Sequence, residues 1–94
     1  MQRIYRYPLT GATQQKLALP IGAHILRAAK MANGTISLYA MVDIDQKVTG
    51  EVEVGITGTG WDVPNLPIYN PNNHFMTVQD EVGFVWHVFI RNIN

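Results

Sequence analysis

The sequence predicts an all-β domain, folded as a small sandwich or a partly open barrel of about seven mostly antiparallel strands. Turn-forming residues recur roughly every eight to twelve positions. The segments between them are rich in valine, isoleucine, leucine, tyrosine and phenylalanine, and no segment shows a convincing helical repeat. A chain of 94 residues is long enough for one modest core. We therefore expect residues 1–94 to form a single β domain.

Four strands are expected in the first half of the chain. The first two, residues 2–7 and 13–19, stop at prolines, which cannot donate a hydrogen bond to a sheet. The next two, residues 24–31 and 35–42, flank Asn33-Gly34. This dipeptide between apolar runs indicates a two-residue type I′ hairpin, in which both central residues have positive φ.

Three strands are expected in the second half, at residues 50–57, 74–79 and 83–92. In the first of these, valine and isoleucine alternate with Glu51 and Glu53, which predicts one solvated face that carries both carboxylates. A tight hairpin through residues 80–82 joins the last two strands. The expected core consists of these residues: Ile4, Leu17, Leu19, Ile25, Ile36, Leu38, Ala40, Val52, Val54, Ile56, Val78, Phe84, Trp86 and Val88.

The last strand is apolar on both faces, so a second layer or a partner subunit must cover it. Only 15% of the residues are charged, which also favours a covered surface. We therefore expect a homo-oligomer.

Residues 58–73 fit no regular element, because they contain three prolines, two glycines and four asparagines. Such a long connection is either a solvated crossover or a binding loop. Its large apolar side chains favour a loop that packs against another surface; they are Trp61, Leu66, Ile68 and Tyr69.

The charge balance excludes several functions. Seven lysines and arginines match seven aspartates and glutamates, so no net field attracts DNA, RNA or an anionic membrane. The absence of cysteine excludes disulfides and thiolate chemistry. No apolar run reaches the ~20 residues of a membrane span. We expect a soluble protein of the cytoplasm.

Catalysis and metal binding have weak support in the sequence. The single serine, Ser37, lies in the middle of a predicted strand, and no base is placed beside Thr57 or Thr59. The three histidines show no recognised ligand spacing, although His74 and His87 could face each other across the last hairpin. We expect no enzyme activity, no cofactor, no catalytic residue and no metal ligand.

Nucleotide binding has more support. Gly58-Thr59-Gly60 follows a predicted strand, where backbone amides can converge on a phosphate, but the spacing matches neither the P-loop nor the dinucleotide fingerprint. Arginine forks fit phosphate oxygens, and flat rings stack on bases. A tight turn and core packing are the alternative explanations for these residues. The predicted ligand-binding residues are Arg3, Arg6, Arg27, Tyr39, Gly58, Thr59, Gly60, Trp61 and His87.

Five stretches carry a family resemblance: IYRYPL (4–9), LPIGAHIL (19–26), LYAMVD (38–43), ITGTG (56–60) and VWHVF (85–89). In this order they resemble a family of short tailed-phage proteins of unknown function. The resemblance implies kinship with phage anti-defence proteins that sequester the cyclic dinucleotide signals of bacterial CBASS immunity without cleaving them. Its implied partner is a small-molecule nucleotide held by a homo-oligomer in the host cytoplasm. Residues 61–73 match least, so the resemblance implies no role for them.

A second hypothesis belongs to another class. The apolar outer face of the last strand and the 58–73 loop could bind a host or phage protein, which would make the chain a protein-interaction module.

Overall fold

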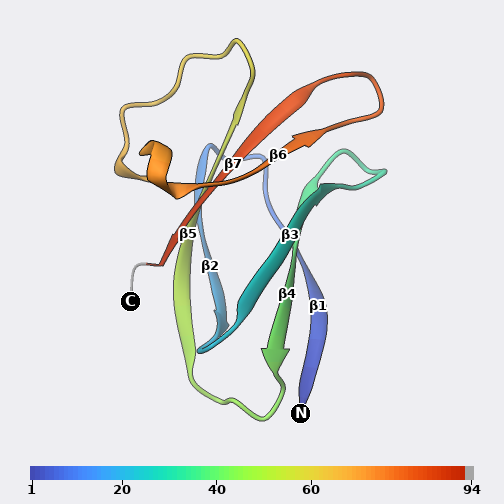
Figure 1. Ribbon diagram of the computed structural model, residues 1–94, viewed down its shortest axis with the longest axis vertical. Coiled ribbons are helices and arrows are strands. Elements are labelled where there is room, and N and C mark those ends of the chain that lie inside the picture. The colour runs from blue at the N-terminus through green and yellow to red at the C-terminus, as the bar shows by residue number, and fades with distance from the viewer. Residues whose placement is uncertain (93–94) are drawn as a thin grey trace.

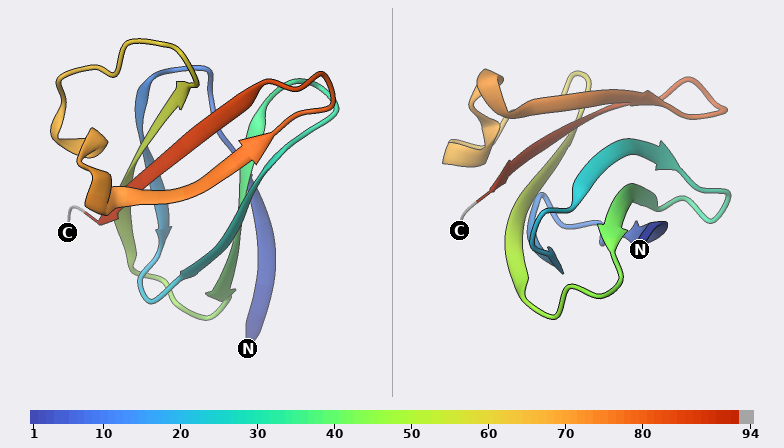
Figure 2. Two further views of the ribbon diagram at one scale, coloured as in Figure 1. Left: turned by 45° about the horizontal axis from the view of Figure 1, so that its top comes forward. Right: turned by 60° about the horizontal axis from the view of Figure 1, so that its bottom comes forward.

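Seven β-strands form two antiparallel sheets in the computed structural model, which describes residues 1–92 (Figure 1). One sheet has the order β1-β4-β3 and the other β2-β5-β7-β6. They stack as two layers that do not close into a barrel (Figure 2), which confirms the predicted fold class. The strands are β1 (Gln2–Pro8), β2 (Gln14–Pro20), β3 (His24–Lys30), β4 (Ile36–Asp43), β5 (Thr49–Gly58), β6 (His74–Gln79) and β7 (Val85–Asn92).

Two hairpin turns, β3–β4 and β6–β7, have the same construction. Each is a three-residue loop in which a turn is followed by a glycine with positive φ, 88° at Gly34 and 90° at Gly83. No other residue type has positive φ within residues 1–92, so the predicted type I′ turn at Asn33-Gly34 is wrong. The side chain of Asn33 instead accepts hydrogen bonds from the Thr35 amide and hydroxyl, which stabilises the longer loop.

The core lies between the sheets and largely matches the prediction. Eight of the fourteen expected residues are buried: Leu19, Ile36, Leu38, Ala40, Val52, Val54, Val78 and Val88. Leu17, Ile25, Ile56 and Trp86 are partly buried against it. Ile4 and Phe84 are 58% and 63% exposed, so those two predictions are wrong. Ile4 lies on the outer face of its sheet, and Phe84 belongs to the β6–β7 turn, one residue before β7.

The chain between β5 and β6 covers the outer face of the larger sheet. Two 3₁₀ turns, η1 (Pro67–Tyr69) and η2 (Pro71–Asn73), interrupt it, and η1 buries Ile68 and Tyr69. The Tyr69 ring packs edge-to-face on Phe89 at 5.2 Å, above Gly55, where a Cβ would lie only 3.0 Å from its Cζ. The second apolar face of β7 is therefore covered by its own chain, so it requires no partner subunit.

Glu53 does not lie on a solvated face, contrary to the prediction, because it is only 4% exposed. Lys16 and Arg91 are its cross-strand neighbours, and Arg91 Nε donates to its carboxylate at 2.6 Å. Gln14 donates to the other oxygen. Burial alone would raise the pKa of Glu53, but these hydrogen bonds and the positive charges of Arg91 and Lys16 lower it. Glu53 is thus a structural carboxylate that links three strands.

Candidate functional site

Three of the predicted ligand-binding residues, Arg6, Tyr39 and Arg27, lie side by side in one row across the sheet β1-β4-β3. Tyr39 on the central strand pairs with Arg6 on β1 and with Arg27 on β3. Directly paired residues point to the same face of a sheet, here the face away from the buried Leu38 and Ala40. Both arginines are exposed and Tyr39 is half-buried. We call these three residues the arginine–tyrosine row.

A β-bulge brings Arg27 into this row. The register of β3 against β4 shifts between Ile25 and Arg27, so Leu26 has no paired residue on β4 and is 46% exposed. Without the bulge, Leu26 would oppose Tyr39, and Arg27 would point to the core side. Strict alternation along β3 would place Arg27 on the same face as Ile25, and the bulge places the two on opposite faces.

The two arginines of the row keep their hydrogen-bonding capacity. The ion pairs within residues 1–92 involve the N-terminus, Lys30 and Arg91, and neither arginine of the row has a carboxylate partner. Arg6 donates to Met31 Sδ at 3.3 Å, and thioether sulfur is a weak acceptor. Phosphate oxygens would be stronger acceptors for both guanidinium groups.

A shallow depression beside the row gives it an apolar floor. It is lined by Ile4, Leu26, Arg27, Ala29 and Tyr39. The face thus combines two arginines that have no carboxylate partner within residues 1–92, one aromatic ring and exposed aliphatic side chains, a set that can hold a phosphate and stack a planar ring.

Gly58, Gly60 and Trp61 lie elsewhere, at the end of β5. A Cβ on Gly58 would lie 3.0 Å from Trp61 Cε2, so this glycine provides the space for the indole. Trp61 also packs edge-to-face on Trp86, with ring centroids 5.1 Å apart. The Thr59 amide donates to the Val85 carbonyl at 3.0 Å and is therefore already bonded. The turn thus provides the space in which the Trp61 indole packs.

Thr59 and His87 belong to a hydrogen-bonded chain on the outer face of the larger sheet. His87 Nε2 lies 2.8 Å from the Thr59 hydroxyl, and Nδ1 lies 3.2 Å from that of Thr77. The Thr77 hydroxyl in turn lies 3.1 Å from His74 Nε2. The two histidines do approach each other across the last hairpin, with ring centroids 6.1 Å apart.

A second hollow lies between the sheets, beside the β3–β4 turn. It encloses about 180 Å³ and is lined by Thr10, Gly11, Thr13, Lys30, Gly34, Thr35, Ile36, Ile56, Trp61 and Trp86. This volume is below the ~300 Å³ at which pockets begin to enclose drug-sized ligands. Only one small ring system would fit.

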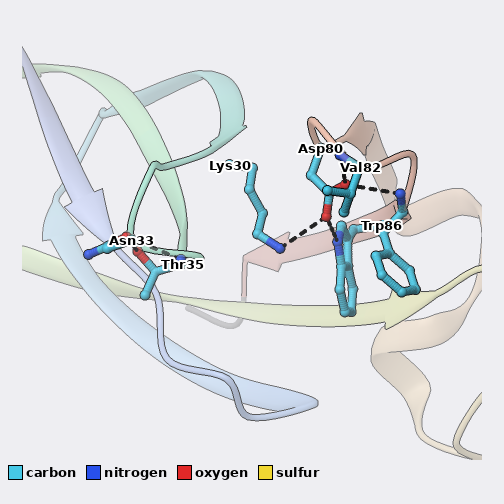
Figure 3. Close-up of polar contacts among 7 residues, drawn as sticks. Lys30, Asn33, Thr35, Asp80, Val82 and Trp86 are labelled. Atoms are coloured by element: carbon cyan, nitrogen blue, oxygen red, sulfur yellow. Dashed lines mark hydrogen bonds and ion pairs between the residues drawn. The ribbon is translucent and has the colours of Figure 1, made fainter.

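The only cation of this hollow is already paired. Figure 3 shows Lys30 pointing from β3 toward Asp80 in the β6–β7 turn and Trp86 on β7, with Nζ 3.4 Å from the carboxylate and 4.8 Å from the indole centroid. Asp80 also accepts from the amides of Val82 and Phe84. Burial would raise the pKa of Asp80, but these hydrogen bonds and Lys30 lower it. The cluster therefore links the two sheets. Because Asp80 neutralises the positive charge of Lys30, little of that charge remains to attract an anion.

The nine predicted residues therefore fall into separate places. Arg3 pairs with Val42 and lies on the opposite face of β1 from Arg6. The row unites three residues, the end of β5 holds Gly58, Gly60 and Trp61, and the outer face of the larger sheet holds Thr59 and His87. Sequence reasoning missed Lys30 and Asp80. An aspartate three residues before a glycine is a turn signal that could have indicated Asp80.

A family model described as "Domain of unknown function (DUF7352)" matches residues 1–94. The chain belongs to this family. The expected membership of a family of unknown function is thus confirmed, and its phage origin stays a prediction. Comparison with curated proteins and with solved structures finds no significant match.

Two further features bear on the site. Residues 1–92 contain no group of three or more histidines, aspartates and glutamates placed to hold a metal ion. No helix among these residues is long and apolar enough to cross a membrane.

Proposed function

We propose that this DUF7352 protein binds a nucleotide at the arginine–tyrosine row. The observation that carries the proposal is the pairing of Arg6 and Arg27 on either side of Tyr39, with no carboxylate partner for either arginine in the described chain. Two strand spacings separate the arginine backbones, about 9.5 Å. Their forks can bind two phosphates, or two edges of one, while Tyr39 stacks on a base.

The ligand class follows from the family resemblance in the sequence. It implies a phage protein that sequesters a cyclic dinucleotide of CBASS immunity in the host cytoplasm and does not cleave it. A sequestering protein needs stoichiometric binding and no activated nucleophile. The row supplies binding groups of that kind.

Calorimetry with a panel of cyclic dinucleotides tests the proposal. We expect sub-micromolar affinity, about 8 kcal/mol or more, and an unchanged nucleotide after incubation. Replacing Arg27 by glutamate should weaken binding at least about thirtyfold, because repulsion replaces a charge-assisted hydrogen bond worth ~2 kcal/mol.

Arg3→Glu is the matched control, because it makes the same charge change on the opposite face of the same sheet. Absence of heat with every nucleotide, or equal losses in both variants, would contradict the proposal.

A protein-interaction module remains the second candidate, in a modified form. The outer face of β7 is covered by Ile68 and Tyr69, but the loop exposes Trp61 by 55% and Val63 by 58%. Neighbouring exposed apolar side chains are typical of a contact surface. A partner captured by the wild type and lost with Trp61→Ser, together with no nucleotide binding, would favour this function.

A further inference from the structure

β1 is an edge strand whose free side is left open in the described chain (Figure 1). The other three edges differ from it. β3 and β6 each carry a bulge and contact each other across the sheets, and β2 contacts β4 of the opposite sheet. β1 pairs with β4 without any register shift, and all its residues except Tyr7 are exposed. A regular, open edge of this kind is a template for another strand.

The hydrogen bonds to β4 identify which groups of β1 are free. The Leu9 amide donates to the Ile36 carbonyl at 2.9 Å, and the Ile44 amide donates to the Met1 carbonyl at 3.0 Å. Antiparallel pairing alternates, so the odd-numbered residues of β1 bond to β4. The amides of Gln2, Ile4 and Arg6 therefore point to the open edge.

We propose that β1 pairs with β1 of a second copy of this chain, antiparallel and with the two-fold axis at Ile4. This register places Gln2 opposite Arg6 of the second copy, so all three free amides on each strand find carbonyl acceptors. A two-fold axis at Arg3 or Arg6 would oppose like charges. An axis at Tyr5 would place Gln2 opposite Pro8, whose nitrogen cannot donate to the Gln2 carbonyl.

Side chains on both faces fit this register. Ile4, which is 58% exposed, lies beside its own equivalent, and Arg3 lies opposite Tyr5 of the second copy, an arrangement that suits a cation–π contact. The result is a six-stranded sheet with both arginine–tyrosine rows on one face, about 14 Å apart along the strands. The pairing does not depend on nucleotide binding.

Ile4→Pro tests the pairing without breaking the β1–β4 ladder, because the amide it removes points away from β4. Ile4→Thr is the matched control: it also truncates the side chain but keeps the amide and suits a strand. In sedimentation without nucleotide and at rising concentration, the wild type and Ile4→Thr should approach twice 10.5 kDa. Ile4→Pro should stay monomeric, with its dissociation constant raised more than about tenfold.

Amide hydrogen exchange on the wild type gives a second measurement, should the proline variant fail to fold. Protection of the Ile4 amide should rise with protein concentration, whereas that of Tyr5, which bonds to β4, should not depend on dimerisation. A wild type that stays monomeric at every concentration, a dimer unaffected by Ile4→Pro, or an Ile4 amide that exchanges freely in the dimer would overturn the proposal.

Discussion

Replacing Tyr69 by phenylalanine tests how the 59–73 segment is held on the sheet. The Tyr69 hydroxyl donates to the Ile56 carbonyl at 3.0 Å and also contacts the Thr13 carbonyl, and the residue is only 7% exposed. Phenylalanine keeps the ring above Gly55 and its contact with Phe89, so only the hydroxyl is lost. The change isolates these hydrogen bonds.

The expected cost of Tyr69→Phe follows from these contacts. One buried hydrogen bond contributes about 0.5–1.5 kcal/mol, and an acceptor left unsatisfied adds to the cost. The Thr13 carbonyl still accepts from the Ile56 amide, at 3.4 Å. We expect a loss of about 1–2 kcal/mol in the free energy of unfolding, which lowers the Tm of a domain this size by roughly 5–15 °C.

The pH dependence gives a second readout from the same variant. Burial raises the pKa of Tyr69 above its ordinary value. A raised pKa means that the folded protein holds the proton more tightly, so the stabilisation is complete below the ordinary tyrosine pKa of ~10 and is lost as the pH rises through the raised value. The Tyr69→Phe variant should not show this loss of stability at alkaline pH.

Urea unfolding at neutral and alkaline pH measures both effects. A variant as stable as the wild type, with the same alkaline decline, would refute the role of the hydroxyl. Tyr69→Ala is the comparison that removes the ring as well, and should cost about 3–5 kcal/mol.

Three other substitutions test the remaining contacts, and a fourth, at an exposed position, is their control. Gly55→Ala should cost about 1–3 kcal/mol in urea unfolding, because its Cβ would press on Tyr69 and Ile68. Asp80→Asn should be less stable than the wild type at neutral pH. The lowered pKa of Asp80 means that its ionised form stabilises the fold above the ordinary aspartate pKa, and this stabilisation is lost as the pH falls through the lowered pKa. The variant should therefore lack this loss of stability in acid. Val88→Ala should cost about 2–3 kcal/mol, whereas Phe84→Ser, at an exposed turn position, should change the Tm little.

The strands could be predicted from the sequence because their signals are local. Alternation in residues 50–57 and prolines after residues 7 and 19 depend only on neighbouring residues. The position of the 58–73 segment in the fold could not be predicted in the same way. Its position depends on Tyr69 meeting Gly55 and Phe89, a contact made only after the sheet has formed.

The arginine–tyrosine row shows the same limit for the site. Arg6, Arg27 and Tyr39 could be proposed as ligand-binding residue types, but their meeting depends on the strand order β1-β4-β3. It depends as well on the bulge at Leu26, which the alternation of β3 does not reveal. His87 and Arg3 are residue types equally suited to bind a nucleotide, yet they lie on other faces.

Amide chemical shifts of ¹⁵N-labelled protein, titrated with a cyclic dinucleotide, test the central claim most directly. Binding at the arginine–tyrosine row should move the resonances around Arg6, Arg27 and Tyr39 on β1, β3 and β4, and leave those around His87 unchanged. Shifts confined to the hollow around Lys30 and Trp86 or to residues 59–73, or no shifts with any nucleotide, would contradict it.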